Sequence, residues 1–498
     1  MNETIASAAM RPYSGKGSKA SVVALSMLFL VVLLSLAVRL PFFTSPLVGE
    51  EGGHAMLVLG EETVGQRTAN GFPQIMIGRI GGSDLFVSFE RNIVPYIFLD
   101  RVVRSAGWSS WIGADSVERI SLASRMPFLT LFVIGGSVLL AAAFRSARTL
   151  SGVAMAVPFV IAGYILTTPL AVGASLQPQI DGSVGVLLVG ITAWVIVLRS
   201  EKGWRIFVTS VLAGLVSGLG KHEWAVALVA ATAVVWGIAM LQHRLAPGRQ
   251  DAQAMRRMNG TAAGLVLGVA LGVALCLMVS VQEYLYGIFL MERMTRGDKS
   301  ILLQFLRNLP FTYPLWIMVA GAGLMLLVLF ARRLLVERFV ECVLAVWGMG
   351  IATGYLWSAW PGDGFPRYFM PALLLVGLSV LLGFSRALPA LPRAVAPLLI
   401  LCATAGMAVN VLSAYDKSER GVSITSYPGK SLSAFSQHLD TVITRAQTEG
   451  IIVVDSSSVG IYNKNIEFMS EALSWEGAVD YVRRFYPGLE GKLVATFE

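Results

Sequence analysis

Two adjacent glutamates, Glu50 and Glu51, follow the first long apolar run of the chain. A carboxylate within reach of a hydroxyl group can take its proton, which is the chemistry of a general base. Adjacent carboxylates also repel each other, which favours a raised pKa for one of them. His54 follows at helical spacing, but one histidine beside two acids matches a metal site poorly. We therefore consider the pair a candidate catalytic base without a metal, with a solvated turn as the ordinary alternative.

Further polar residues stand at the predicted ends of apolar runs, on the same predicted face as the two glutamates. They are Arg39, Asp181, Lys221, His222, Arg367 and Tyr368, and Arg91 lies in the loop that follows the glutamates. Ionisable groups at membrane depth are functional candidates by default. Each also has an ordinary reading. Asp181 could cap a helix, Lys221 could extend to the membrane surface, and Arg367 could bind lipid headgroups.

The elements that position these residues are predicted to be membrane helices. The chain has 498 residues, of which 55% are hydrophobic and 14% charged, whereas soluble domains have about 25% charged residues. Apolar runs of about 20 residues recur, which is the length that crosses a bilayer. The alternating segments of a membrane barrel are missing from the sequence. The net charge of +8 comes from clusters between apolar runs, so it does not indicate binding to nucleic acid.

Eleven membrane spans are predicted from these runs. They lie at 21–43, 122–144, 151–173, 182–198, 205–220, 224–241, 260–282, 310–330, 340–359, 368–385 and 395–413. Clusters of arginine and lysine occupy alternate short loops, and the positive-inside rule places those loops in the cytoplasm. The N-terminus is then inside and the C-terminus outside. The spans at 205–220 and 224–241 are the hardest to separate, because only three residues divide them.

The predicted organisation is a cytoplasmic tail at 1–20, a transmembrane module at 21–414, and a small extracytoplasmic α/β domain at 415–498. The module includes a first extracytoplasmic loop at 44–121, in which 55–64 and 91–104 have the pattern of surface helices. In the tail, apolar residues at helical spacing predict one helix. These residues are Leu432, Phe435, Leu439, Val442, Ile443 and Ala446. Ile451–Val454 and 493–497 are predicted strands.

Small residues inside the spans suggest packing roles. Gly264, Gly268 and Gly272 are spaced by four and predict a face on which two helices pack closely. Cys276, Cys342 and Cys402 lie in apolar runs and are interpreted as packing residues, with no disulfide or metal spacing.

Several short motifs occur in order along residues 21–385. A span ends in Arg39 and is followed by Gly49-Glu50-Glu51, and the later motifs are Arg125-Met-Pro127, Asp181, Gly218-Leu-Gly-Lys221 and Arg367-Tyr368-Phe-Met-Pro371. Together they resemble the GT-C superfamily of membrane glycosyltransferases. The branch that they resemble contains protein O-mannosyltransferases and bacterial transferases of aminoarabinose or galacturonic acid to lipid A, and is glycosyltransferase family 39-like. Two departures are Glu50 in place of the usual aspartate, and Asn92–Tyr96 in place of a Lys/His-Pro-Pro element.

The resemblance implies a GT-C fold and an inverting glycosyltransferase. Such an enzyme moves a sugar from a polyprenyl-phosphate carrier to an acceptor hydroxyl on the extracytoplasmic face. Glu50 would be the base, with Glu51 as its alternate. Lys221 and Arg367 would stabilise the leaving phosphate, with Arg39 and Arg91 behind them, and Asp181 would hold sugar hydroxyls or orient a cation. His222 and Tyr368 adjoin these cations and belong to the same substrate-binding set.

The implied partners are a lipid-linked sugar donor, membrane lipids, and an acceptor in lipid A or lipopolysaccharide, another envelope glycan, or a protein. No cofactor is required, because the carrier is a substrate. The expected location is the bacterial inner membrane, with the site facing the periplasm. A transporter or flippase of lipid-linked glycans, and a polymerase or ligase of such glycans, are the alternatives.

Overall fold

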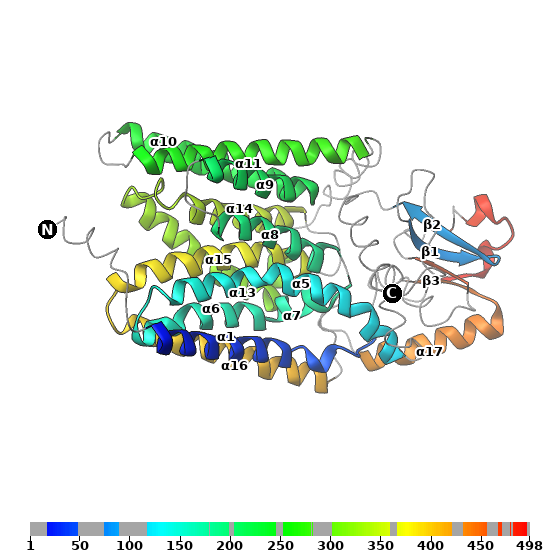
Figure 1. Cartoon of the computed structure of the whole chain (residues 1–498). Helices are drawn as coiled ribbons and strands as arrows, with labels where there is room; N and C mark the ends of the chain where they lie inside the picture. The colour runs from blue at the N-terminus through cyan, green and yellow to red at the C-terminus, as the bar shows by residue number, and fades with distance from the viewer. Residues whose placement is uncertain are drawn as a thin grey trace.

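The computed structural model is a helical bundle with a small sheet beyond one of its ends (Figure 1). It describes residues 17–47, 74–88, 117–178, 180–198, 204–245, 252–279, 281, 301–358, 366–420, 432–455, 467–470, 479 and 482–495. The helices of the bundle are α1 (Gly17–Ala37), α5 (Val117–Ala147), α6 (Val157–Thr167), α7 (Pro169–Leu176), α8 (Gly185–Leu198), α9 (Trp204–Leu219), α10 (His222–Leu245), α11 (Ala252–Val279), α13 (Ile301–Ala331), α14 (Phe339–Ser358), α15 (Met370–Ala387) and α16 (Val395–Glu419). Short turns link several of them, including η2 (Leu40–Phe42), η3 (Gly152–Ala156), η4 (Ile180–Val184), η5 (Pro366–Phe369) and η6 (Leu388–Ala390).

Every predicted span coincides with one or two of these helices. Within the described residues, eight helices are long and apolar enough to cross a membrane, and the bent pair formed by 152–167 and α7 would make nine. Helices α8 and α9 are shorter. The chain is therefore a helical membrane protein, while eleven spans and their orientation remain predictions. The two spans that were hardest to separate are two helices, because α9 ends at Leu219 and α10 begins at His222.

Burial differs sharply between helices, and this fixes which of them lie at the centre. In the most apolar 18-residue stretch of the span that contains α15, 83% of the residues are buried, whereas in that of α16 only 11% are buried. Leu398, Leu401 and Leu412 of α16 are exposed, as are Val22 and Phe29 of α1. Apolar side chains on the outside of the bundle are expected where lipid is the solvent.

Helices α9 and α11 pack through glycine on both sides, as the spacing predicted. A Cβ atom added to Gly268 would lie 2.1 Å from the carbonyl oxygen of Val211, and one added to Gly214 would lie 2.2 Å from that of Leu265. Side chains at these positions would force the backbones apart. Close approach of this kind brings dispersion contacts that hold helices together in lipid.

Two of the three cysteines are packing residues, and the prediction of a packing role was wrong for the third. Cys276 and Cys342 are buried, but Cys402 is exposed on α16. An apolar run on an outer helix has a lipid-facing side, and Cys402 lies on it.

The sheet combines strands from two distant parts of the chain. Its order is β2-β1-β4-β3-β5, with β1 (Gln74–Ile80), β2 (Ser83–Ser88), β3 (Ile452–Asp455), β4 (Phe468–Ser470) and β5 (Leu493–Ala495). Strand β1 is antiparallel to both β2 and β4, and β3 is parallel to both β4 and β5. A hairpin from the first loop therefore completes the sheet of the tail.

The predicted helix and strands of the tail are confirmed as α17 (Leu432–Glu449), β3 and β5. The hairpin of β1 and β2 was not predicted. Its turn is made by Gly81 and Gly82, with φ of +60° and +76°, a conformation that glycine adopts without strain. The predicted surface helices at 55–64 and 91–104 lie outside the described residues.

Candidate functional site

Lys221 lies in the break between α9 and α10, and its side chain is only 3% exposed. Its ammonium group donates a hydrogen bond of 3.3 Å to the hydroxyl of Tyr355 on α14. The same nitrogen lies 4.9 Å from the centre of the Tyr368 ring and 5.4 Å from that of Tyr355. Aromatic faces attract cations electrostatically, so this cage offsets part of the cost of burying the charge. A lysine placed merely to reach the membrane surface would be more exposed.

Arg367 and Tyr368 belong to η5, the turn that leads into α15. Arg367 is 3% exposed. Its guanidinium lies 4.9 Å from the centre of the Tyr368 ring and donates a hydrogen bond of 3.3 Å to the Tyr368 hydroxyl. Lys221 lies at the same distance from that ring. Two buried cations from distant parts of the chain therefore flank one tyrosine.

A frame of aromatic side chains fixes this pair of cations. The rings of Tyr355 and Tyr368 are stacked, with centres 5.0 Å apart. The indole N–H of Trp224 donates to the Tyr355 hydroxyl at 3.2 Å, and the indole of Trp347 donates to the Trp224 carbonyl at 2.9 Å. Tyr355, Trp224 and Trp347 were not predicted as site residues. Each lies within an apolar run, where an aromatic residue is ordinary core.

His222 and Glu223 begin α10 beside Lys221. The Nδ1 atom of His222 lies 3.4 Å from one oxygen of the Glu223 carboxylate, and Lys221 Nζ lies 4.0 Å from the other. A carboxylate in the first turn of a helix is favoured by the helix dipole. Glu223 therefore links two of the predicted binding residues, and it is an acidic group near the cations that the predicted set did not include.

Asp181 lies in η4, a turn of π-helix at 180–184. Such turns are rare and are frequent at functional sites. The turn packs tightly, since a Cβ atom on Gly182 would lie 2.8 Å from the Ala174 carbonyl oxygen, and one on Gly185 would lie 2.5 Å from the Trp224 ring. It also contacts η5. The backbone at Asp181 is thus at the same end of the bundle as Lys221 and Arg367, but its side chain lies outside the described parts of the structure.

Arg39, predicted to stand behind the two phosphate-binding cations, contacts α1 and α7. It is 1% exposed, and it donates to Ser175 Oγ at 2.7 Å, to Ser35 Oγ at 2.8 Å and to the Ala171 carbonyl at 3.3 Å. Its guanidinium also bonds the Ser35 carbonyl. Four of its five N–H groups therefore have protein acceptors, and Arg39 fastens the end of α1 to α7.

Arg125 on α5 fixes the start of the first loop. It is fully buried, and its guanidinium donates to the carbonyl oxygens of Leu176, Phe43 and Pro46 at 3.1, 3.3 and 3.2 Å, and also to that of Ser45. The motif Arg125-Met-Pro127 therefore has a positioning role that the sequence did not reveal. Because α7 accepts bonds from both Arg39 and Arg125 and contacts η5, it is the helix around which this end of the bundle is organised.

The remaining predicted residues, Glu50, Glu51 and Arg91, lie outside the described residues, so their roles stay predictions. Among the described residues, no group of three or more His, Cys, Asp or Glu side chains could hold a metal ion. His54 is also outside that part of the chain.

The residues that the structure describes at this end form a buried, positively charged aromatic cluster. Such a cluster can bind and stabilise an anion, and a phosphate in particular. The sequence matches no protein-family model and no curated protein.

Proposed function

We propose that this protein is an inverting glycosyltransferase that takes a sugar from a polyprenyl-phosphate carrier. The observation that supports it best is the pair of buried cations, Lys221 and Arg367, that flank Tyr368 at the end of the bundle where the first loop begins. Cations that the fold holds in place can stabilise the charge of a phosphate. A lipid-linked phosphate would meet this pair at membrane depth.

The proposed reaction begins at the acceptor. Glu50, or Glu51, takes the proton of an acceptor hydroxyl while its oxygen forms a bond to the anomeric carbon of the sugar. The bond from that carbon to the phosphate oxygen breaks, and polyprenyl phosphate leaves with the electron pair. Lys221 and Arg367 stabilise the charge that develops on the phosphate. Attack from the face opposite the leaving group inverts the anomeric centre.

The position of Pro46, four residues before Glu50, supports the assignment of the glutamates to this reaction. Arg125 holds the chain at Pro46, and four residues of chain span at most about 14 Å. The proposal places Glu50 within that reach, near the end of the bundle that contains Lys221. General-base catalysis of this kind contributes about 10²–10⁴-fold to rate.

A transporter of lipid-linked glycans is the second candidate, because one observation favours it. The helix at 152–167 and α7 are bent by 58° at Thr168, and discontinuous helices are typical of transporters. Pro169 begins α7, and the Thr168 hydroxyl accepts a bond from Ala171 N at 3.2 Å, so the break is locally stabilised. A transporter would move the carrier without breaking the sugar–phosphate bond.

Separate measurements of carrier binding and sugar transfer test the proposal. We expect Glu50→Gln with Glu51→Gln to retain binding of polyprenyl phosphate but to lose transfer by about 100-fold or more, because a general base contributes about 10²–10⁴-fold to rate. Lys221→Gln should weaken both. The control is Arg393→Gln, an exposed arginine at the opposite end of the bundle. Unchanged transfer by the double glutamate variant, at normal expression, would refute the enzyme assignment. Movement of an intact donor would favour the transporter.

A further inference from the structure

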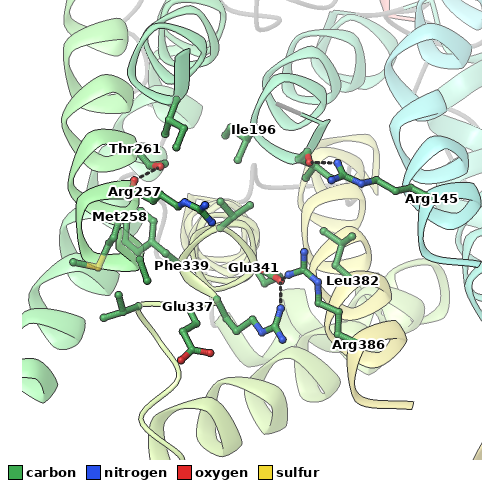
Figure 2. A pocket seen from close by; sticks show the side chains of 16 residues that line it. Arg145, Ile196, Arg257, Met258, Thr261, Glu337, Phe339, Glu341, Leu382 and Arg386 are labelled. Carbon is green, nitrogen blue, oxygen red and sulfur yellow. Dashed lines mark hydrogen bonds and ion pairs between the residues drawn. The ribbon is translucent and has the colours of Figure 1, made fainter. Parts of the chain in front are cut away.

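A cavity of about 410 Å³ lies at the opposite end of the bundle, the end that the positive-inside rule places in the cytoplasm. None of the predicted site residues lines it. Its walls come from the ends of α5, α8, α9, α11, α14 and α15, so it lies where six helices converge. Figure 2 shows its lining side chains.

Arginines dominate the charge of this cavity. Arg145, Arg257, Arg338 and Arg386 line it, with Glu337 and Glu341 as the acidic lining residues. Four positive charges against two negative charges leave a net charge of +2. The planar guanidinium of arginine can donate two parallel hydrogen bonds to two oxygens of a phosphate, so arginine suits phosphate binding well.

Glu341 organises one side of the cavity. Its side chain is nearly buried, and it forms an ion pair with Arg386 of α15 and a longer one of 3.9 Å with Arg338. In Figure 2, Arg257 and Arg386 reach toward Glu341 from different helices, while the carboxylate of Glu337 is directed away from this group. Glu341 therefore joins two of the arginines, and the lining as a whole keeps its net positive charge.

Arg145 brings charge from the other side of the cavity. It is exposed, and its guanidinium donates to the Val197 carbonyl oxygen at 3.0 Å. A carbonyl fixes the direction of the side chain but carries no net charge, so the positive charge of Arg145 remains available to a ligand. Arg145 lies in the last turn of α5 and Arg386 in the last turn of α15, so the helices of the bundle hold both residues.

Apart from Thr261, the rest of the lining is apolar and includes Ile196, Met258 and Leu382. A free inorganic ion would need no such wall. Ligand pockets typically enclose about 300–1,000 Å³, so the volume suits one phosphate with a small organic group attached. Basic pockets between membrane helices on the cytoplasmic side commonly bind anionic lipid headgroups.

We propose that this cavity, which we call the arginine cavity, binds a phosphate ester in which the phosphate contacts Arg145 and Arg257 and the attached organic group lies against Ile196 and Met258. The ligand is either the headgroup of an anionic phospholipid or a soluble phosphate ester, since both present the same chemistry. The site is separate from the proposed sugar-transfer site and does not depend on it.

The test uses the purified full-length protein in detergent. One arm measures retention of phosphatidylglycerol by native mass spectrometry, with phosphatidylcholine as the neutral comparison. The other arm measures stabilisation by glycerol 3-phosphate and by inorganic phosphate in thermal unfolding. The variants are Arg145→Gln and Arg257→Gln. The matched control is Arg393→Gln, because Arg393 is exposed at the same end but does not line the cavity.

We expect each cavity variant to weaken binding by about five- to tenfold, from the interaction of one arginine with an anionic group, while Arg393→Gln leaves it unchanged. Selective loss of phosphatidylglycerol identifies a lipid site, and selective loss of glycerol 3-phosphate identifies a soluble ligand. The proposal is overturned if wild-type protein binds none of the three probes, or if the control weakens binding as much as the cavity variants do. The wild-type measurement keeps the test decisive even where a variant folds poorly.

Discussion

Substitution of Gly268 by alanine tests how Lys221 is positioned. Helix α9 ends two residues before Lys221, so the packing of α9 on α11 sets where that residue lies. A Cβ atom at position 268 would lie 2.1 Å from Val211 O, 2.8 Å from Leu215 N and 2.9 Å from Gly214 Cα. Observed Cβ contacts are essentially never shorter than 3.0 Å. All three atoms are backbone, so no side-chain rotation relieves the overlap.

The two helices must therefore separate by about 1 Å, and overpacking of this kind costs about 1–3 kcal/mol. The matched control is Gly260→Ala in the same helix, where nothing lies within 4 Å of the added atom. That control should gain up to about 1 kcal/mol from helix propensity. The propensity gain is common to both variants, so we expect them to differ by the overpacking cost of about 1–3 kcal/mol in free energy of unfolding.

The assay is thermal or denaturant unfolding in one detergent, followed by circular dichroism, with carrier binding measured on the same samples. Gly268→Ala should unfold at a lower temperature than wild type and should bind the carrier more weakly. Equal stability of Gly268→Ala and Gly260→Ala would refute the argument from close backbone packing.

Two further predictions concern contacts of the first loop and of the helix that follows it. Arg125→Lys should destabilise the protein by about 3 kcal/mol or more, because an ammonium group cannot reach the carbonyls of both Leu176 and Pro46 and each lost charged hydrogen bond costs about 1.5–3 kcal/mol. The control is Arg119→Lys, at an exposed position of the same helix. Equal midpoints of unfolding for the two variants would contradict the positioning role of Arg125. Gly78→Cys combined with Met469→Cys should form a disulfide under oxidising conditions, because these residues are partners across β1 and β4. After proteolysis between β1 and β4, the two fragments should stay joined until the disulfide is reduced. Two separate fragments without reduction would contradict the pairing of β1 with β4.

The helices were predictable from sequence because lipid imposes a strong rule. Each run of about 20 apolar residues must satisfy its backbone internally, and a helix does so. The glycine spacing of α11 likewise reflects a local requirement for close packing. The bend at Thr168 was not predicted, because Pro169 lies within a largely apolar stretch that reads as one continuous span.

The sheet was only half predictable. Strand β3 overlaps a run of four apolar residues, Ile451–Val454, and was evident. Strands β1 and β2 depend on pairing with a segment almost 400 residues later, as the bond of 2.6 Å from Gly81 N to Glu467 shows. Local sequence does not encode such a partner, and strand formation depends strongly on packing context.

For the candidate site, the charged residues were easier to predict than the aromatic residues that contact them. Lys221 and Arg367 were evident because charge is rare near membrane spans. Tyr355 and Trp224 were not, because aromatic residues in apolar runs look like core. The structural role of Arg39 was also not evident, since its acceptors Ser175 and Ala171 lie more than 130 residues away in sequence.

The most direct test of the central claim is release of carrier by the purified protein. It would be incubated with a panel of polyprenyl-phosphate sugars and an acceptor extract from cell envelopes, and the free polyprenyl phosphate would be measured. We predict release with at least one donor, inversion at the anomeric carbon of the transferred sugar, and loss of both in the double variant Glu50→Gln and Glu51→Gln. Absence of turnover and of binding across the panel would contradict the assignment of this protein as a lipid-linked sugar transferase.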